Sequence, residues 1–378
     1  MSEIAPLRFS LKYAPCLDGM RAIAVLLVML HHSRAPLSAG GFIGVDIFFV
    51  LSGFLITGLL LSEHAKTGTI SFSKFYMRRA LRLLPALFLL LALMLILSPL
   101  FGGLRTTAID AVIVLGYIAN WTKAFGFERP VFLSHCWSLS IEEQFYILWP
   151  ALFLFFSSFL RTRRALLLAI LALTALSGIE RTWLYLSGHP PVRQYAGLDT
   201  RADALLVGCA LAVGLAVYGL PRRGSKAARI VLVGTLIAIP CLAAIVKFAL
   251  WRSAWMQTVG FTLIPLLTAI VVTYLMTNPL SVLTRVLEYA PMVWAGKISY
   301  GLYLFHWPII RYMNNAGFSR WTVIAVAIPA TFLIAGLSYK YIEAPALKLK
   351  ERFRAAAPRP DTTEIPVSIP FSSAAPTP

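Results

Sequence analysis

The sequence predicts an all-α, polytopic membrane protein, as its composition and the length of its apolar runs both indicate. Of 378 residues, 58% are hydrophobic and only 13% are charged, and the mean hydropathy is +0.76. Soluble domains carry about 25% charged residues. Apolar runs long enough to cross a bilayer as helices recur from Leu17 to Ile342. We therefore expect a bundle of transmembrane helices embedded in a lipid bilayer.

These runs predict about ten spans, with both termini in the cytoplasm. The segment 108–120 is apolar but short. Counting it as a full span would move Arg161, Arg163 and Arg164 to the outer side, so we treat it as a short or re-entrant piece. Lys and Arg then concentrate in the inner loops, which is the usual bias of membrane proteins. The expected spans are 17–35, 42–62, 83–101, 141–160, 165–186, 201–219, 229–250, 258–277, 297–315 and 321–342.

The charge of the chain fits a membrane protein rather than a nucleic-acid-binding one. The net charge is +18, but the cations stand in short loops at helix ends, where they set orientation. Anionic phosphate ligands are a second possibility. The four cysteines have no metal-ligand spacing and are too sparse for a disulfide scaffold, so we expect no metal site.

Composition divides the chain into three parts. Residues 1–16 form a cytoplasmic lead, and residues 17–345 form the membrane domain. Residues 346–378 are basic and then rich in Pro, Ala and Ser, a composition typical of disorder. We expect a multi-pass protein of the inner or plasma membrane.

The first span carries a cation and an imidazole on one stripe. Arg21 and His32 are eleven residues apart, which is about 20° past three full turns and about 16 Å along the axis. His31 is turned well away. Ionisable residues inside a span are costly and therefore indicate a functional site. The alternative is that Arg21 snorkels to the interface while His32 caps the helix end.

Two further polar motifs flank later spans. FYMRRALRLLPAL contains a cluster of three arginines, of which Arg78 and Arg82 share one helical face and suit bidentate phosphate contacts. A plain orientation signal is the alternative. SHCWSLSIEEQFYILWP places Glu142 and Glu143 about 100° apart at the start of a span, so that one faces the core and the other the headgroups. Helix capping by Ser138 or Ser140, with the acids in the first turn, is the alternative and is compatible with a function for the same residues.

Together these motifs resemble the membrane acyltransferase 3 family, which O-acylates sugars and related hydroxyls. The family's R-x10-H signature falls on Arg21 and His32, and GVDIFFVLSGFLIT matches its usual continuation. The W-S-L-x-x-E-x-Q-F-Y block and WAGKISYGLYLFHWPII follow in order, so the resemblance covers about residues 15–345. It implies an O-acyltransferase that moves an acyl group, typically acetyl, from cytoplasmic acyl-CoA to a hydroxyl of a glycan, polysaccharide precursor or glycosylated small molecule.

The expected topology separates the site residues into two groups. His32, Asp46 and Glu142 lie toward the outer side, where His32 is expected to be the general base and one of the two carboxylates orients its imidazole. Arg21, Arg78 and Arg82 lie toward the inner side, where they are expected to bind the phosphates of acyl-CoA. For Arg78 and Arg82, the resemblance implies this binding.

The remaining expectations concern the path of the acyl donor and the acceptor. Tyr303 is expected to line the donor path. The residues expected at the acceptor are Trp137, Ser138, Glu143, Arg201, Asp203 and His306. Pairing among Asp199, Arg201 and Asp203 is the favoured alternative for those residues, and a structural role between helices is an equal one for His306. The main alternative function is a transporter or exporter whose buried charges line a translocation path, although paired halves with broken helices are not evident.

Overall fold

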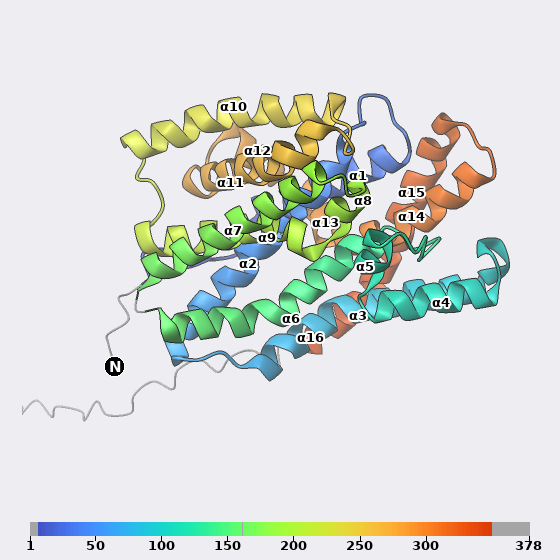
Figure 1. The fold of residues 1–378 in the computed structure, drawn as a ribbon, viewed down its shortest axis with the longest axis horizontal. Coiled ribbons are helices and arrows are strands. Elements are labelled where there is room, and N and C mark those ends of the chain that lie inside the picture. The colour runs from blue at the N-terminus through green and yellow to red at the C-terminus, as the bar shows by residue number, and fades with distance from the viewer. Residues whose placement is uncertain (1–6, 161, 350–378) are drawn as a thin grey trace, which may run out of the picture.

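The computed structural model describes residues 7–160 and 162–349, and over these ranges every regular element is helical. The expectation of disorder for the tail falls almost entirely outside the described residues. Nine helices of the described part are long and apolar enough to cross a membrane, which confirms the polytopic helical bundle (Figure 1). They are α1 (Pro15–His32), α2 (Gly44–Thr67, preceded by a 3-10 turn at Gly41–Ile43), α3 (Phe72–Ile96), α6 (Cys136–Phe159), α7 (Arg163–Leu186), α9 (Leu198–Tyr218), α10 (Lys226–Phe248), α11 (Phe261–Thr277, preceded by a π-helical turn at Met256–Gly260) and α15 (Arg320–Ser338, continuing through a π-helical turn at Tyr339–Glu343 into α16, Ala344–Leu349).

Three boundaries differ from those expected. α3 begins at Phe72 and α6 at Cys136, both earlier than the apolar runs predict, because helices extend into polar turns that hydropathy does not mark. The run at 297–315 is divided into α13 (Ala290–Lys297) and α14 (Ser299–Asn315). With 17 residues, α14 is about 26 Å long, close to the minimum for a span.

The ambiguous segment near residues 108–120 is too short to cross. It folds into α4 (Leu104–Leu115), which is about 18 Å long against a hydrocarbon core of about 30 Å, and the six-residue helix α5 (Ala119–Ala124). α4 lies beside α3 (Figure 1). Asp110 on α4 pairs with Arg129 at 3.2 Å and accepts hydrogen bonds from the backbone amides of Val131 and Phe132. This carboxylate therefore fixes the loop that leads into α6.

α2 and α9 form the centre of the bundle. Their apolar windows are 78% buried inside the protein, whereas that of α10 is only 17% buried. A Cβ on Gly53 of α2 would lie 1.9 Å from the carbonyl oxygen of Leu205, and one on Gly208 of α9 would lie 2.1 Å from that of Val50. The backbones therefore touch, a close approach that small residues permit in membranes.

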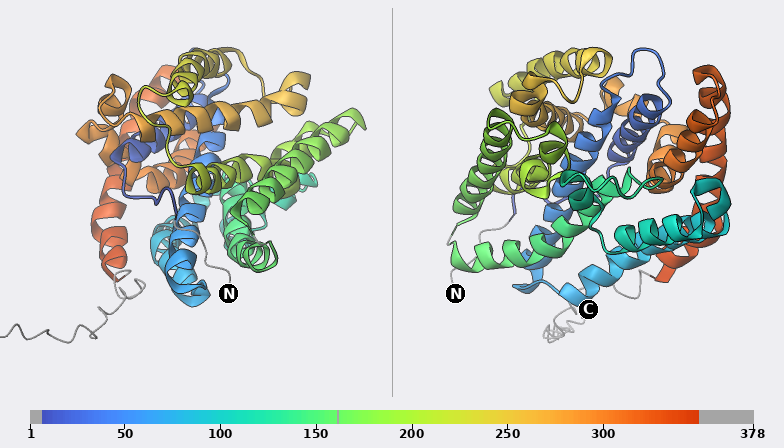
Figure 2. Two further views of the ribbon diagram at one scale, coloured as in Figure 1. Left: turned by 90° about the vertical axis from the view of Figure 1, so that its left-hand side faces the viewer. Right: turned by 45° about the vertical axis from the view of Figure 1, so that its right-hand side comes forward.

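α1 lies between α2 on one side and α13 and α14 on the other (Figure 2). Gly296 of α13 permits a similar backbone contact, because its Cβ would lie 1.9 Å from the carbonyl oxygen of Asp18. The short helices α8 (Pro191–Ala196) and α12 (Val282–Leu287) and a 3-10 turn at Ser98–Phe101 complete the described part. Both ends of the Arg21–His32 stripe are thus held against other helices.

Candidate active site

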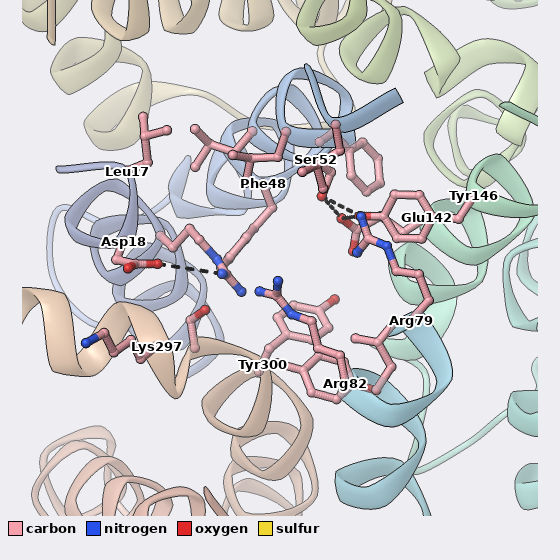
Figure 3. Close-up of a pocket in the computed structure, with 18 of the residues that line it drawn as sticks. Leu17, Asp18, Phe48, Ser52, Arg79, Arg82, Glu142, Tyr146, Lys297 and Tyr300 are labelled. Carbon is pink, nitrogen blue, oxygen red and sulfur yellow. Dashed lines mark hydrogen bonds and ion pairs between the residues drawn. The ribbon is translucent and has the colours of Figure 1, made fainter. Parts of the chain in front are cut away.

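A large cavity of about 580 Å³ lies at the Arg21 end of α1. Its lining includes six cations and three acids, so that positive charge prevails. Figure 3 shows Arg79, Glu142 and Tyr146 together on one side of this space, Lys297 on the opposite side and Arg82 between them. The cations are Lys12, Arg21, Arg78, Arg79, Arg82 and Lys297, and the acids are Asp18, Glu142 and Glu343.

The arginines differ in whether a nearby carboxylate neutralises their positive charge. Arg21 lies 3.8 Å from Asp18, and Arg78 lies 3.4 Å from Glu63. The guanidinium of Arg79 stacks over the ring of Tyr146, 4.0 Å from its centroid. Within the described residues, Arg79 and Arg82 have no carboxylate within 4.0 Å. Arg79 was not among the expected site residues, although it belongs to the same basic cluster, and it shares with Arg82 the i, i+3 spacing of one helical face.

Glu142 lines this large cavity and lies apart from His32. Its carboxylate accepts a hydrogen bond from Ser52, and the hydroxyl of Tyr146, which has a single hydrogen to share between them, lies 3.0 Å from this carboxylate and 2.7 Å from the Ser52 hydroxyl. The helix begins at Cys136 instead of near residue 141, so Glu142 sits almost two turns inside it. Glu143 is buried on another face, with its Oε1 unpaired among the described residues.

Asp46 also has a partner other than His32. It forms an ion pair with Arg201 at 2.6 Å, and both side chains are fully buried. Asp203 pairs with Arg181 at 2.7 Å, and that pair is fully buried as well. The expectation that Arg201 and Asp203 pair with each other is therefore wrong: each bridges to a different helix, and the pairs tie α9 to α2 and α7. The expectation that Asp46 or Glu142 orients the imidazole of His32 is likewise not met by the geometry.

A second, smaller cavity of about 210 Å³ lies at the His32 end of α1. Imidazoles, aromatic rings and one lysine line it, and the charged or titratable members come from α1, α5, α8 and the residue that precedes α6. Trp137, expected at the acceptor from sequence, is among the lining residues. The full set is His31, His32, Lys123, Ser134, His135, Trp137, Tyr195, Trp251 and Trp307.

One backbone carbonyl fixes the protonation pattern of His32. The Nδ1 of His306 lies 2.6 Å from the carbonyl oxygen of Tyr303, which can only accept, so this Nδ1 carries a proton. In a neutral ring the Nε2 of His306 is then an acceptor, and it lies 2.8 Å from the Nδ1 of His32. The Nδ1 of His32 therefore donates, which leaves a lone pair on the Nε2 of His32. That is the arrangement a general base needs.

The neighbouring imidazoles are held differently. The Nδ1 of His31 lies 3.1 Å from the carbonyl oxygen of Ser38, so this ring is tied to the loop between α1 and α2. His135 precedes α6 and donates from Nε2 to the carbonyl oxygen of Leu304 at 3.1 Å. Sequence reasoning did not select His135, although it stands within the quoted motif SHCWSLS.

Hydrogen bonds of two hydroxyl groups link the linings of the two cavities. The hydroxyl of Tyr303 donates to the carbonyl oxygen of His135 at 2.7 Å, so the Ser138 hydroxyl, 2.5 Å away, donates to Tyr303. Tyr303 and Ser138 line the large cavity, whereas His135 lines the small one. We refer to Ser138, Tyr303 and His135 as the partition. Its position puts a cation-lined space on one side and an imidazole-lined space on the other.

The fold and these cavities define a polytopic membrane protein with a site built around one helix, cationic at one end and rich in imidazole at the other. A family model described as an acyltransferase domain, that of acyltransferase 3, matches residues 15–340. The chain therefore belongs to the acyltransferase 3 family.

Two curated relatives give the comparison more detail. The chain is 36% identical over 355 residues to the peptidoglycan O-acetyltransferase OatA of Listeria monocytogenes, an alignment that covers 90% of this chain and 57% of that protein. It is 34% identical over 358 residues to the O-acetyltransferase OatA of Staphylococcus aureus, with coverages of 90% and 58%. The chain thus spans little more than half the length of these relatives. No solved structure matches it significantly.

The part of the chain that the structure describes holds no cluster of three or more His, Cys, Asp or Glu side chains suited to a metal ion.

Proposed function

We propose that this protein is an integral-membrane O-acetyltransferase that takes an acetyl group from acyl-CoA on the cytoplasmic side and transfers it to a glycan hydroxyl on the other. One observation carries the proposal: a cation-lined cavity and an imidazole-lined cavity lie toward the two ends of α1, and the hydrogen bonds of the partition join their linings. The names of the relatives support the acetyl group and the glycan acceptor. The family supports acyl transfer in general.

The large cavity suits the donor. Phosphates and the 3′-phosphorylated ribose of CoA are polyanionic, and arginine forms short, bidentate hydrogen bonds to phosphate. Arg79 and Arg82 are the best candidates, because no carboxylate among the described residues compensates them. Arg21 and Arg78 contribute charge but share it with Asp18 and Glu63. The pantetheine arm then extends along α1 toward Tyr303 and Ser138 in the partition.

In this proposal, His32 is the general base that starts the reaction. Its Nε2 lone pair takes the proton of the acceptor hydroxyl as that oxygen attacks the thioester carbonyl carbon. The new C–O ester bond forms and the C–S bond breaks, so that CoA leaves as a thiolate and receives the proton held by His32. His306 is the positioning residue that fixes the His32 tautomer, the role that a carboxylate plays in catalytic triads.

The test is acetyl-CoA consumption by the purified protein in lipid nanodiscs, where both faces are accessible. Release of free CoA thiol and acetylation of short glycans are followed together for the wild type, His32→Ala and His189→Ala. His189 is an exposed loop histidine and serves as the matched control. We expect His189→Ala to turn over normally and His32→Ala to lose about 10²- to 10⁴-fold in kcat, the usual contribution of a general base.

Two results would contradict the proposal. If His32→Ala keeps full turnover while His31→Ala loses it, the assignment of the base is wrong. If the folded wild type neither binds nor consumes acetyl-CoA, the enzyme assignment fails and the transporter alternative gains weight.

A further inference from the structure

Resting on the proposed function, we propose that the small cavity is the acceptor site and that it binds a single pyranose ring of a glycan, one that bears a carboxylate-containing substituent recognised by Lys123. The cavity volume of about 210 Å³ accommodates one ring and is far smaller than the 580 Å³ of the large cavity. Three features of the lining support this assignment: aromatic faces, two unpaired polar atoms and an uncompensated cation.

The aromatic faces form a continuous wall. The ring centroids of Trp137 and Tyr195 are 4.5 Å apart, and those of Tyr195 and Trp251 are 4.8 Å apart. Arg201 lies behind this wall, with its guanidinium 5.4 Å from the centroid of Tyr195. Large amphipathic rings of this kind offer apolar surface together with a polar edge. A pyranose ring, which has apolar C–H faces and a polar rim of hydroxyls, is complementary to such a wall.

Two buried polar atoms at the cavity lack a partner among the described residues. His135 is 3% exposed, and because its Nε2 donates to Leu304, its unpaired Nδ1 is an acceptor. The indole Nε1 of Trp307 is an unpaired donor. Unpaired buried polar groups are costly and are uncommon unless something binds them. A sugar hydroxyl both donates and accepts, so hydroxyls of one ring satisfy both atoms.

Lys123 supplies the charge. Its ammonium group lies 5.5 Å from the ring centroid of Trp137 and 5.8 Å from that of Tyr195. No carboxylate of residues 7–160 or 162–349 lies within ion-pairing distance of it. A cation held against aromatic rings without a counter-ion at a cavity indicates a ligand that brings its own negative charge. A neutral glycan would leave this charge unpaired.

The small cavity also places the acceptor beside the base. His32 lines it, and the Nε2 of His32 is the atom with the free lone pair. Trp307 packs edge-on against His32, with ring centroids 4.5 Å apart. A ring that contacts Trp307 and His135 therefore presents a hydroxyl within reach of His32. His135 is also the member of the partition whose carbonyl oxygen accepts from Tyr303.

The test compares two soluble tetrasaccharides as acceptors for the full-length protein in nanodiscs. One is chitotetraose, which is neutral, and the other alternates N-acetylglucosamine with N-acetylmuramic acid, whose lactyl groups carry carboxylates. KM for each acceptor and KM for acetyl-CoA are measured for the wild type, Lys123→Gln, Trp307→Phe and Trp183→Phe. Trp183 is an exposed tryptophan of α7 and provides a matched aromatic control.

We expect the wild type to favour the anionic tetrasaccharide about tenfold in KM, and Lys123→Gln to abolish this preference. Trp307→Phe keeps the aromatic face but removes the donor, so KM rises several-fold for both acceptors. KM for acetyl-CoA stays within twofold in each variant, which also reports that the protein is folded. Trp183→Phe matches the wild type throughout.

The outcomes separate this proposal from the proposed function. If transfer proceeds but the Lys123 and Trp307 variants leave both acceptor KM values unchanged, the small cavity is not the acceptor site and the enzyme assignment stands. Wild type that binds acetyl-CoA but acetylates neither tetrasaccharide refutes the acceptor class. Absence of acetyl-CoA binding in folded protein refutes the proposed function itself.

Discussion

The hydrogen bond between His306 and His32 makes a graded prediction. Replacing His306 with leucine removes the acceptor that holds the Nδ1 proton of His32, while leaving the base itself in place. A hydrogen bond between neutral groups contributes about 0.5–1.5 kcal/mol, so kcat should fall about 2- to 13-fold. Replacing His32 with alanine should lower kcat about 10²- to 10⁴-fold. The two effects differ enough to be distinguished in one assay of CoA release.

A conservative variant separates positioning from packing. His306→Gln can offer a side-chain carbonyl to the Nδ1 of His32 and an amide to the carbonyl oxygen of Tyr303, and it should recover most of the lost kcat. The KM values for donor and acceptor should change little in either variant. Equal losses in the leucine and glutamine variants, or a leucine variant as inactive as His32→Ala, would refute the tautomer argument.

Three further predictions follow from the charged groups. Arg79→Ala combined with Arg82→Ala should weaken acetyl-CoA binding at least tenfold by calorimetry, since a hydrogen bond to a charged group contributes about 1.5–3 kcal/mol. Unchanged affinity would mean that these arginines serve only to orient the protein in the membrane. Burial lowers the pKa of Lys123 in α5 to about 8, so the preference for the anionic tetrasaccharide should be full below that pH and disappear above it. The ratio of kcat/KM for the two acceptors is measured, because the titration of His32 affects both equally and cancels. A ratio that stays constant to pH 10 would contradict the role of Lys123. Asp46→Ala should cost about 3–5 kcal/mol of stability, because it leaves Arg201 buried and unpaired. In thermal unfolding, the double variant Asp46→Ala with Arg201→Met should lose much less stability than Asp46→Ala alone. Equal losses in the single and the double variant would count against the ion pair.

The sequence was sufficient for the features that depend on local periodicity. The apolar runs predicted the helical bundle, and the weak run at 108–120 was short for a span, as α4 confirms. The eleven-residue spacing within α1 placed Arg21 and His32 at its two ends, and each now lines a different cavity.

What the sequence could not supply are contacts between distant segments. The partner of His32 is His306, 274 residues later, and that of Asp46 is Arg201, 155 residues later. Any of several carboxylates was chemically suitable for His32, and only the packing of α1 against α14 selects an imidazole instead. The position of Glu142 was misjudged for a related reason, since the helix start at Cys136 lies in a polar stretch that hydropathy does not mark.

The partition has a consequence for the membrane as a barrier. In the proposed function, a small, uncharged acetyl group passes the contact of Tyr303 and Ser138, whereas CoA, with its phosphates, stays among the arginines. The two hydroxyls and the carbonyl oxygen of His135 hydrogen-bond to one another, so no continuous column of water needs to join the cavities. In the proposed mechanism the acetyl group crosses this contact in one direction and the proton held by His32 crosses to the CoA thiolate in the other, so each turnover moves no net charge.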